Sequence, residues 1–267
     1  MIEECNLKES KFEEVVKITY LKNVVNKAIG LIHFGIEELE EINFVNSGNY
    51  DFIFLFLSRG FELLMKSVIC FKSYEDDRSF PTEEEMRDMG HDLDKLRKEI
   101  IKNYDKIPEN ASEKYQEIEN DKKFISNDDT LIKLIKLLTM FSKSGRYFEL
   151  NFITKNTKEI FRQRNNGIRG IDYSNDPIKI MRILVHNYVV KNHPFLANLD
   201  DFNDLNEPWL EANRLYIIPP LKKFIGALAR QFSLGILGDK AKECISKDRY
   251  SYLNLKDYKV EDKDSDN

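Results

Sequence analysis

Every strong apolar pattern in this chain has the spacing of a helix, with apolar residues recurring every three or four positions. That period is typical of amphipathic helices, so we predict an all-α fold, an up-and-down helical bundle with additional C-terminal helices. The longest predicted helices cover about residues 10–41, 50–74, 129–144 and 177–193, and further helices start near Asp92 and Asn206.

Capping residues and prolines mark several helix ends. Ser10–Glu13 and Thr82–Glu85 both have a hydroxyl followed three residues later by a carboxylate, which is the spacing of a capping box. Asp176 followed by Pro177 predicts another helix start. The Pro219–Pro220 pair predicts a division between two helices, because neither proline fits deep in a helix interior.

The apolar pattern also predicts which faces are buried. In the first helix, the expected inward positions are Phe12, Val15, Val16, Thr19 and Val24. The second helix is apolar on nearly every side and is therefore expected at the centre of the bundle. Residues 103–127 are polar and poorly periodic, which predicts a loop or a short exposed helix.

Composition favours one domain. Gly 11 and Pro 7 are few for 267 residues, and no linker or internal repeat divides the sequence. We expect a domain over residues 1–245, with a bundle core at about 10–195 and C-terminal helices at about 206–245. Residues 246–267 are polar and acidic, and are expected to form a frayed tail.

Charge and cysteine usage indicate a cytoplasmic protein. The net charge of −5 gives no global field that recruits nucleic acid or acidic lipid, although a local basic patch can do so. The three cysteines lie far apart, as in a reduced protein. No apolar leader segment is present, and three charges interrupt Phe52–Phe71, so no membrane span is expected.

Several classes of site are excluded by missing motifs. The chain contains neither a glycine-rich phosphate loop nor an HExxH motif. Its four histidines have no cysteine neighbours at zinc-binding spacing. We therefore expect no metal and no cofactor.

Three charged residues share one stripe of the apolar second helix. Arg59, Glu62 and Lys66 fall within about 60° of arc at 100° per residue. Because unpaired buried charge is costly, these side chains need partners. They are expected either to form a structural ion-pair network or to line a ligand cleft or a dimer contact.

The helix after Asp176 carries a second charged face. Lys179, Arg182, His186 and His193 also fall within about 60° of arc if the helix is regular. Metal-free RNA cleavage needs an imidazole to move a proton and a cation to hold the phosphate, and this face supplies both. The alternative is an ordinary solvated basic face.

A third basic segment is KNTKEIFRQRNNGIR, residues 155–169, with five basic residues and one acid. Arg162, Arg164 and Arg169 are candidate phosphate contacts. Short basic stretches are also common on ordinary protein surfaces.

Three segments, in this order, resemble the HEPN superfamily of helical domains found in prokaryotic defence and toxin–antitoxin loci. Leu57–Lys66, LSRGFELLMK, is similar to the "hxxELLxK" face of the family's second helix. Gly90–Leu96 is similar to the "HDLxxL" opening of its third helix, and Gly145–Phe148 to the "RY" that ends the next one. The resemblance covers about residues 50–150 and adds His91, Arg146 and Tyr147 to the candidate ligand-binding residues.

Active members of that family resemble metal-independent ribonucleases with Arg-x(4–6)-His on a late helix. Here only three residues separate Arg182 from His186, and Ile183 stands where active members often have asparagine. The resemblance implies a binding and dimerisation module whose ligand is RNA or a nucleotide, with a homodimeric state and a protein partner encoded nearby. The alternatives are a metal-independent endoribonuclease toxin with Arg182, His186 and His193 as catalytic residues, and a protein-binding scaffold without activity.

Overall fold

The computed structural model describes residues 2–105, 115–143, 161–163, 169–171, 176–194, 196 and 205–244. At residues 2–10, 47 and 115 and in both strands it describes the backbone alone. The first half contains α1 (Ile2–Glu41), η1 (Ser47–Asn49), α2 (Tyr50–Asp77), α3 (Glu83–Met89), α4 (Leu93–Ile101), η2 (Lys102–Asp105), α5 (Tyr115–Asn127) and α6 (Asp129–Lys143). The second half contains β1 (Phe161–Gln163), β2 (Arg169–Ile171), α9 (Pro177–Asn192), α10 (Asn206–Ala212), the π-helical η7 (Asn213–Ile217), α11 (Ile218–Ser233) and α12 (Asp239–Lys242).

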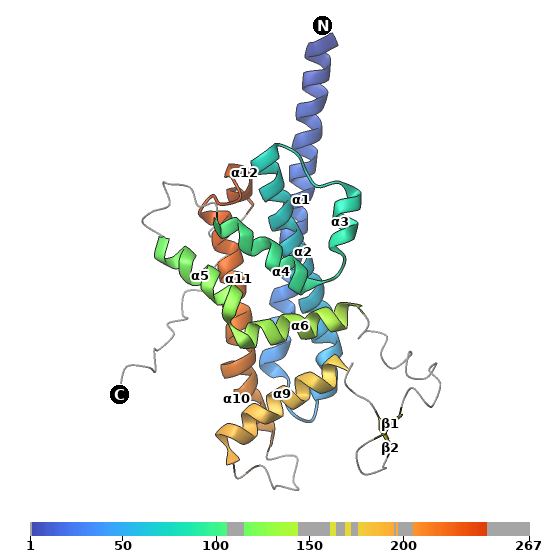
Figure 1. The fold of residues 1–267 in the computed structure, drawn as a ribbon, viewed down its shortest axis with the longest axis vertical. Helices are drawn as coiled ribbons and strands as arrows, with labels where there is room; N and C mark the ends of the chain where they lie inside the picture. Colours follow the sequence, from blue (N-terminus) through green and yellow to red (C-terminus); the bar gives the residue numbers. More distant parts are fainter. Residues whose placement is uncertain are drawn as a thin grey trace.

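The all-α fold class predicted from the apolar period is confirmed. The long helices α1, α2 and α11 follow the long axis of the molecule, and α4, α5, α6 and α9 lie across them (Figure 1). The described strands form one antiparallel pair of three residues each, in which Arg162 lies opposite Gly170 and Arg169 opposite Gln163.

The helices α1 and α2 form a tightly packed antiparallel pair. A Cβ atom added at Gly60 of α2 would lie 2.6 Å from Ile32 Cγ1 and 3.0 Å from the Ala28 carbonyl oxygen of α1. One added at Gly35 of α1 would lie 2.7 Å from Leu57 Cγ. Glycine at these positions lets the two backbones approach closely.

The central position predicted for α2 is confirmed. This helix packs against α1, α4, α6 and α11, and most of its side chains are buried, apart from an exposed stripe that includes Phe52, Leu55 and Arg59. One cluster of buried apolar side chains joins α1, α2, α4, α5 and α6 to α9, α10, α11 and α12. The C-terminal helices therefore share the core of the N-terminal ones.

Three of the five inward positions predicted for α1 are wrong. Phe12 and Val15 are 71% and 59% exposed, Thr19 is exposed, and Val16 and Val24 are half-buried. The buried side chains of this helix are instead Ile18, Val25, Ala28, Ile32, Ile36 and Leu39. The prediction followed apolar residues near the N-terminus, where α1 projects beyond the bundle and has little to pack against (Figure 1).

Most of the predicted caps are confirmed. Thr82 and Glu85 form a capping box at the start of α3. The Asp92 side chain accepts a hydrogen bond from Lys95 N at the start of α4. Asp176 accepts bonds from the backbone N–H groups of Ile178 and Lys179 at the start of α9.

Two predicted helix boundaries are wrong. α1 is already helical from Ile2, so Ser10 lies inside the helix rather than at its start. The chain also stays helical through Pro219 and Pro220, which lie in the first turn of α11 directly after the π-helical η7. The break is avoided because first-turn residues do not need an N–H donor.

Residues 115–127, expected in a loop or a short exposed helix, form α5, and one face of this helix is buried. Ile118, Phe124 and Ile125 belong to the core, and α5 packs against α11. The buried Asp121 carboxylate receives two hydrogen bonds from the Arg230 guanidinium, at 2.5 and 2.6 Å. The prediction missed this face because the helix is short and most of its residues are polar, so few apolar residues are available to show a helical period. Residues 246–267, the predicted tail, lie outside the described residues.

Candidate functional site

Glu62 is the centre of a charged network on α2. Its side chain is only 3% exposed, and its Oε1 lies 3.0 Å from Lys66 Nζ and 3.3 Å from Arg59 Nη1. Its Oε2 lies 3.0 Å from His91 Nδ1, which belongs to the connection between α3 and α4. Burial raises the pKa of the Glu62 carboxyl, but the bonds from His91 and Lys66 outweigh this effect and the pKa lies below its ordinary value.

The two sequence segments that carry Glu62 and His91 are therefore brought into contact. Both oxygens of the Glu62 carboxylate are bonded by side chains of the same chain. Such an arrangement stabilises the junction of α2 with the α3–α4 connection. A ligand-binding role for Arg59, Glu62, Lys66 and His91 stays a prediction.

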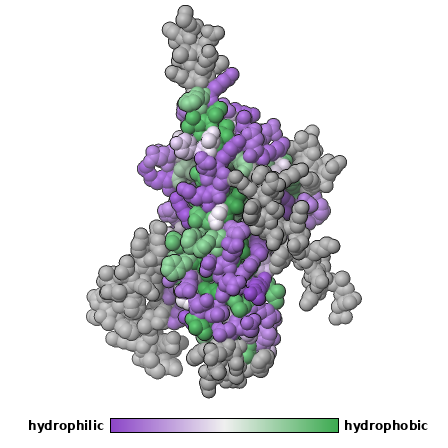
Figure 2. Space-filling model, turned by 180° about the vertical axis from the view of Figure 1, so that it is seen from behind, coloured by the Kyte–Doolittle hydropathy of each residue, from purple (hydrophilic) through white to green (hydrophobic). Residues whose placement is uncertain are grey.

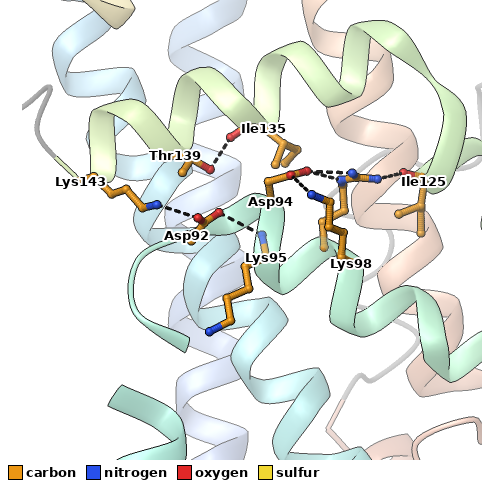
Figure 3. Close-up of polar contacts among 9 residues, drawn as sticks. Asp92, Asp94, Lys95, Lys98, Ile125, Ile135, Thr139 and Lys143 are labelled. Carbon is orange, nitrogen blue, oxygen red and sulfur yellow. Dashed lines mark hydrogen bonds and ion pairs between the residues drawn. The ribbon is translucent and has the colours of Figure 1, made fainter. Parts of the chain in front are cut away.

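The acidic residues after His91 hold α4 against its neighbours (Figure 3). Asp92 Oδ2 lies 2.6 Å from Lys143 Nζ in the last turn of α6. Asp94 pairs with the buried Arg97, whose guanidinium also donates to the Ile125 carbonyl oxygen of α5 at 2.6 Å. The HDLxxL segment thus links α4 to both α5 and α6.

Three of the four candidate residues of α9 line one cavity. It has a volume of about 480 Å³ and opens beside the first half of that helix. Lys179, Arg182 and His186 lie on its wall at helical spacing, as predicted from the sequence. The acidic residue on the wall is Asp176, whose carboxylate is engaged by the first backbone N–H groups of α9. A cavity of this size can hold a small aromatic ligand with a phosphate group.

An aromatic wall, which sequence reasoning missed, completes the cavity. Phe44 and Trp209 line it and pack edge-to-face, with ring centroids 5.1 Å apart. The Arg182 guanidinium lies over the Phe44 ring, 5.7 Å from its centroid. Nothing in the sequence pairs Phe44 with Trp209, because 165 positions separate them in the chain.

A buried hydrogen-bond network holds this wall rigid. Trp209 Nε1 donates to the Tyr50 hydroxyl at 3.0 Å, and that hydroxyl donates to Asn213 Oδ1 at 3.1 Å. Asn213 Nδ2 in turn donates to the Ile42 carbonyl oxygen at 2.9 Å. Burial raises the pKa of Tyr50 to about 12, so the hydroxyl stays protonated and keeps its donor role at neutral pH.

His193 is separated from the other candidate catalytic residues. It caps the C-terminal end of α9, and its Nε2 lies 3.1 Å from Glu211 Oε2 of α10. Seven residues of helix place it about 10 Å along the axis from His186. His193 is not among the residues that line the cavity.

The remaining candidate residues are not placed in this cavity. Arg162 and Arg169 lie in the β1–β2 pair, and their side chains are outside the described part. Arg146, Tyr147 and Arg164 lie outside the described residues altogether.

Two structural features are not found in the described ranges. Within them, no group of three or more His, Cys, Asp or Glu side chains is placed to hold a metal ion. In the same part of the chain, none of the helices combines the length and apolar character needed to cross a bilayer.

No protein-family model, curated protein or solved structure matches the sequence or the fold.

Proposed function

We propose that this chain is a HEPN-like helical binding and dimerisation module of a prokaryotic defence, toxin–antitoxin or stress system. Its ligand is RNA or a nucleotide, bound in the cytoplasm in the cavity on α9. A protein encoded nearby is its expected partner. The prokaryotic setting rests on the sequence resemblance, and the ligand class rests on the cavity.

The observation that supports this ligand is the meeting of cations and aromatic rings in one space. Lys179 and Arg182 provide positive charge for a phosphate, and His186 adds a hydrogen-bond donor. Phe44, which is half-buried, provides apolar surface for a nucleobase, and the buried Trp209 packs behind it. Because the Arg182 guanidinium lies over the Phe44 ring, the cation and the aromatic ring border the same space.

The alternative proposal is a metal-independent endoribonuclease using Arg182 and His186. Cleavage by the 2′-hydroxyl needs both a base and an acid, and one imidazole serves only one role at a time. Because His193 pairs with Glu211 away from the cavity, the described cavity wall holds one histidine, and a second imidazole would have to come from His186 of another copy. Binding without cleavage therefore requires fewer assumptions.

A fluorescence titration tests the binding proposal, since Trp209 is the only tryptophan and lines the cavity. The probes are inorganic phosphate, AMP and a single-stranded pentaribonucleotide. We expect AMP and the oligonucleotide to change Trp209 emission, and Arg182→Ala to weaken their binding about 10- to 100-fold, the value of a charged hydrogen bond. Arg182→Lys should lose less, and Lys136→Ala, an exposed residue of α6, should change nothing.

The scaffold alternative gains if none of the probes binds at millimolar concentration and the purified protein carries no nucleic acid by its 260 nm absorbance. The nuclease alternative is tested by incubating RNA with the protein in chelator. Cleavage that His186→Ala lowers by at least about 10²-fold, with RNA binding retained, would establish it. RNA that stays intact with and without added metals would exclude the nuclease alternative and leave the binding module as the proposed function.

A further inference from the structure

Gly30 has no structural explanation within the described part of the chain. It lies inside the 40-residue helix α1, where glycine is a poor helix former. A Cβ atom added at Gly30 would meet nothing within 4 Å, whereas Gly35 and Gly60 each face a close neighbour across the α1–α2 contact. Glycine in an open position of a helix allows a second chain to approach closely from outside.

Gly30 lies in the middle of the outer face of α1. This face lies on the opposite side of the helix from the buried stripe that includes Val25, Ala28 and Ile32. Its exposed positions alternate in spacing between three and four residues, which is the spacing of a helix–helix contact. They are Tyr20, Asn23, Lys27, Gly30, Phe34, Glu37 and Glu41.

The spacing of the outer face is symmetric about a point midway between Gly30 and Phe34. Counted towards the N-terminus from Gly30, the next positions are three and then four residues away, at Lys27 and Asn23. Counted towards the C-terminus from Phe34, they are again three and then four residues away, at Glu37 and Glu41. A second α1 that crosses antiparallel at this midpoint therefore brings each position from Asn23 to Glu41 opposite another member of the same face, whereas Tyr20 lies beyond the paired positions. A two-fold axis through the midpoint gives the isologous contact that closes a dimer.

The residues brought together in this way are chemically complementary. Lys27 lies opposite the partner's Glu37, so a cation meets a carboxylate at two symmetric positions. Among the described residues, Lys27 belongs to no ion pair, and Glu37 is 61% exposed and pairs only with His33 of its own helix. A parallel pair would instead place Lys27 against its own copy, so the charges favour the antiparallel orientation.

The centre of the contact explains the glycine. Gly30 lies opposite the partner's Phe34, whose ring needs the space that a missing side chain leaves. Phe34 is 43% exposed and packs edge-to-face on Phe56 of α2, so its ring is held in place on the surface. The two positions form a knob and a hole, and the two-fold axis repeats the pair.

Exposed apolar side chains continue the same surface. Tyr20 is 70% exposed on the outer face, and Phe12, towards the N-terminus of α1, is 71% exposed. Phe52, one turn before Phe56 on α2, is 64% exposed. Apolar patches lie along the length of the molecule on the face shown in Figure 2. Exposed apolar side chains beside the crossing become buried when a second copy covers α1.

We propose that the outer face of α1 is the interface of a symmetric homodimer, in which two copies of α1 cross antiparallel between Gly30 and Phe34. This inference rests on the dimerisation part of the proposed function and is independent of the ligand. It makes α1 rather than α2 the main dimer contact, because most side chains of α2 are buried by its own chain. Phe44 follows the C-terminal end of α1, so the two cavities lie about 35 Å apart along the paired helices. Each cavity then contains a single His186, which favours binding over cleavage.

Sedimentation equilibrium of the full chain at tens of micromolar tests the proposal by charge reversal. Wild-type protein should have twice the mass of one chain. Lys27→Glu and Glu37→Lys should each raise the dissociation constant about tenfold or more, because each places like charges together at two symmetric positions. An equimolar mixture of the two variants should recover the dimer, because both contacts of the mixed pair join opposite charges. Lys133→Glu, at an exposed position of α6, is the matched control and should dimerise normally.

Gly30→Ala provides a second, independent variant. Its methyl group has free space in the single chain and meets the partner's Phe34 in the dimer. It should raise the thermal midpoint of dilute monomer while weakening the dimer. A monomeric wild-type protein would overturn both this interface and the proposed dimerisation. A dimer that survives Lys27→Glu, or a mixture that stays monomeric, would overturn the α1 interface alone, and AMP binding by the Lys27→Glu monomer would show that the ligand proposal stands.

Discussion

Replacement of Glu62 by alanine removes the carboxylate that Arg59, Lys66 and His91 share. The Lys66 side chain is only 16% exposed, so its ammonium group remains largely out of water without its partner. Loss of such a charged hydrogen bond costs about 1.5–3 kcal/mol. Arg59 and His91 are 52% and 50% exposed and can be rehydrated, so each adds about 0–1 kcal/mol. The expected loss in the free energy of unfolding is therefore about 1.5–5 kcal/mol, which overlaps the range for a fully buried pair.

Urea denaturation at pH 7, followed by circular dichroism at 222 nm, measures this loss. The matched control is Glu119→Ala on the exposed face of α5, which should change the free energy of unfolding by less than about 0.5 kcal/mol. The double variant Glu62→Met with Lys66→Met removes both the carboxylate and the cation it leaves buried. It should be more stable than Glu62→Met alone by about 1 kcal/mol or more.

Two results would refute the reasoning about Glu62. A loss below about 1 kcal/mol in Glu62→Ala would mean that the network contributes no more than a surface ion pair. A double variant less stable than Glu62→Met would mean that Lys66 is not left with an uncompensated charge. Either result would mean that a stabilising ion-pair network does not explain the charges of Arg59, Glu62, Lys66 and His91.

Two further predictions concern pH and packing. The pKa values of Glu62, Asp92 and Asp94 lie below their ordinary values because the hydrogen bonds that their carboxylates accept, together with nearby positive charge, outweigh the effect of burial. The stability that these three carboxylates contribute is therefore complete above their unfolded-state pKa values near 4, and it is lost as the pH falls through their lower folded-state pKa values. The urea midpoint should fall between about pH 5 and 3. This decrease should be less steep in Glu62→Gln, which has one of these carboxylates fewer. Gly60→Ala should lower the free energy of unfolding by about 1–3 kcal/mol, because its methyl group would lie 2.6 Å from Ile32. An unchanged urea midpoint in Gly60→Ala would contradict the close α1–α2 contact.

The sequence by itself determined the helical class and most helix starts. Both are local properties: a 3.6-residue apolar period needs only neighbouring turns, and a cap such as Asp176 bonds N–H groups two and three residues away. The charged stripe of α2 and the face formed by Lys179, Arg182 and His186 were predicted for the same reason. Residues spaced by three, four or seven positions share one side of a helix wherever that helix lies.

The tertiary structure decided which of these faces are buried and what they meet. Phe12 and Val15 have the apolar character of core residues, but α1 extends past the bundle there and no second helix of the described part covers them. Phe44 and Trp209 form one wall because the connection after α1 packs beside α10, a contact between segments distant in sequence. His186 lies within α9 and His193 caps its C-terminal end, but the His193 side chain pairs with Glu211 because α10 lies against α9. Local periodicity contains no information about such long-range contacts, because they depend on how the helices pack around α2.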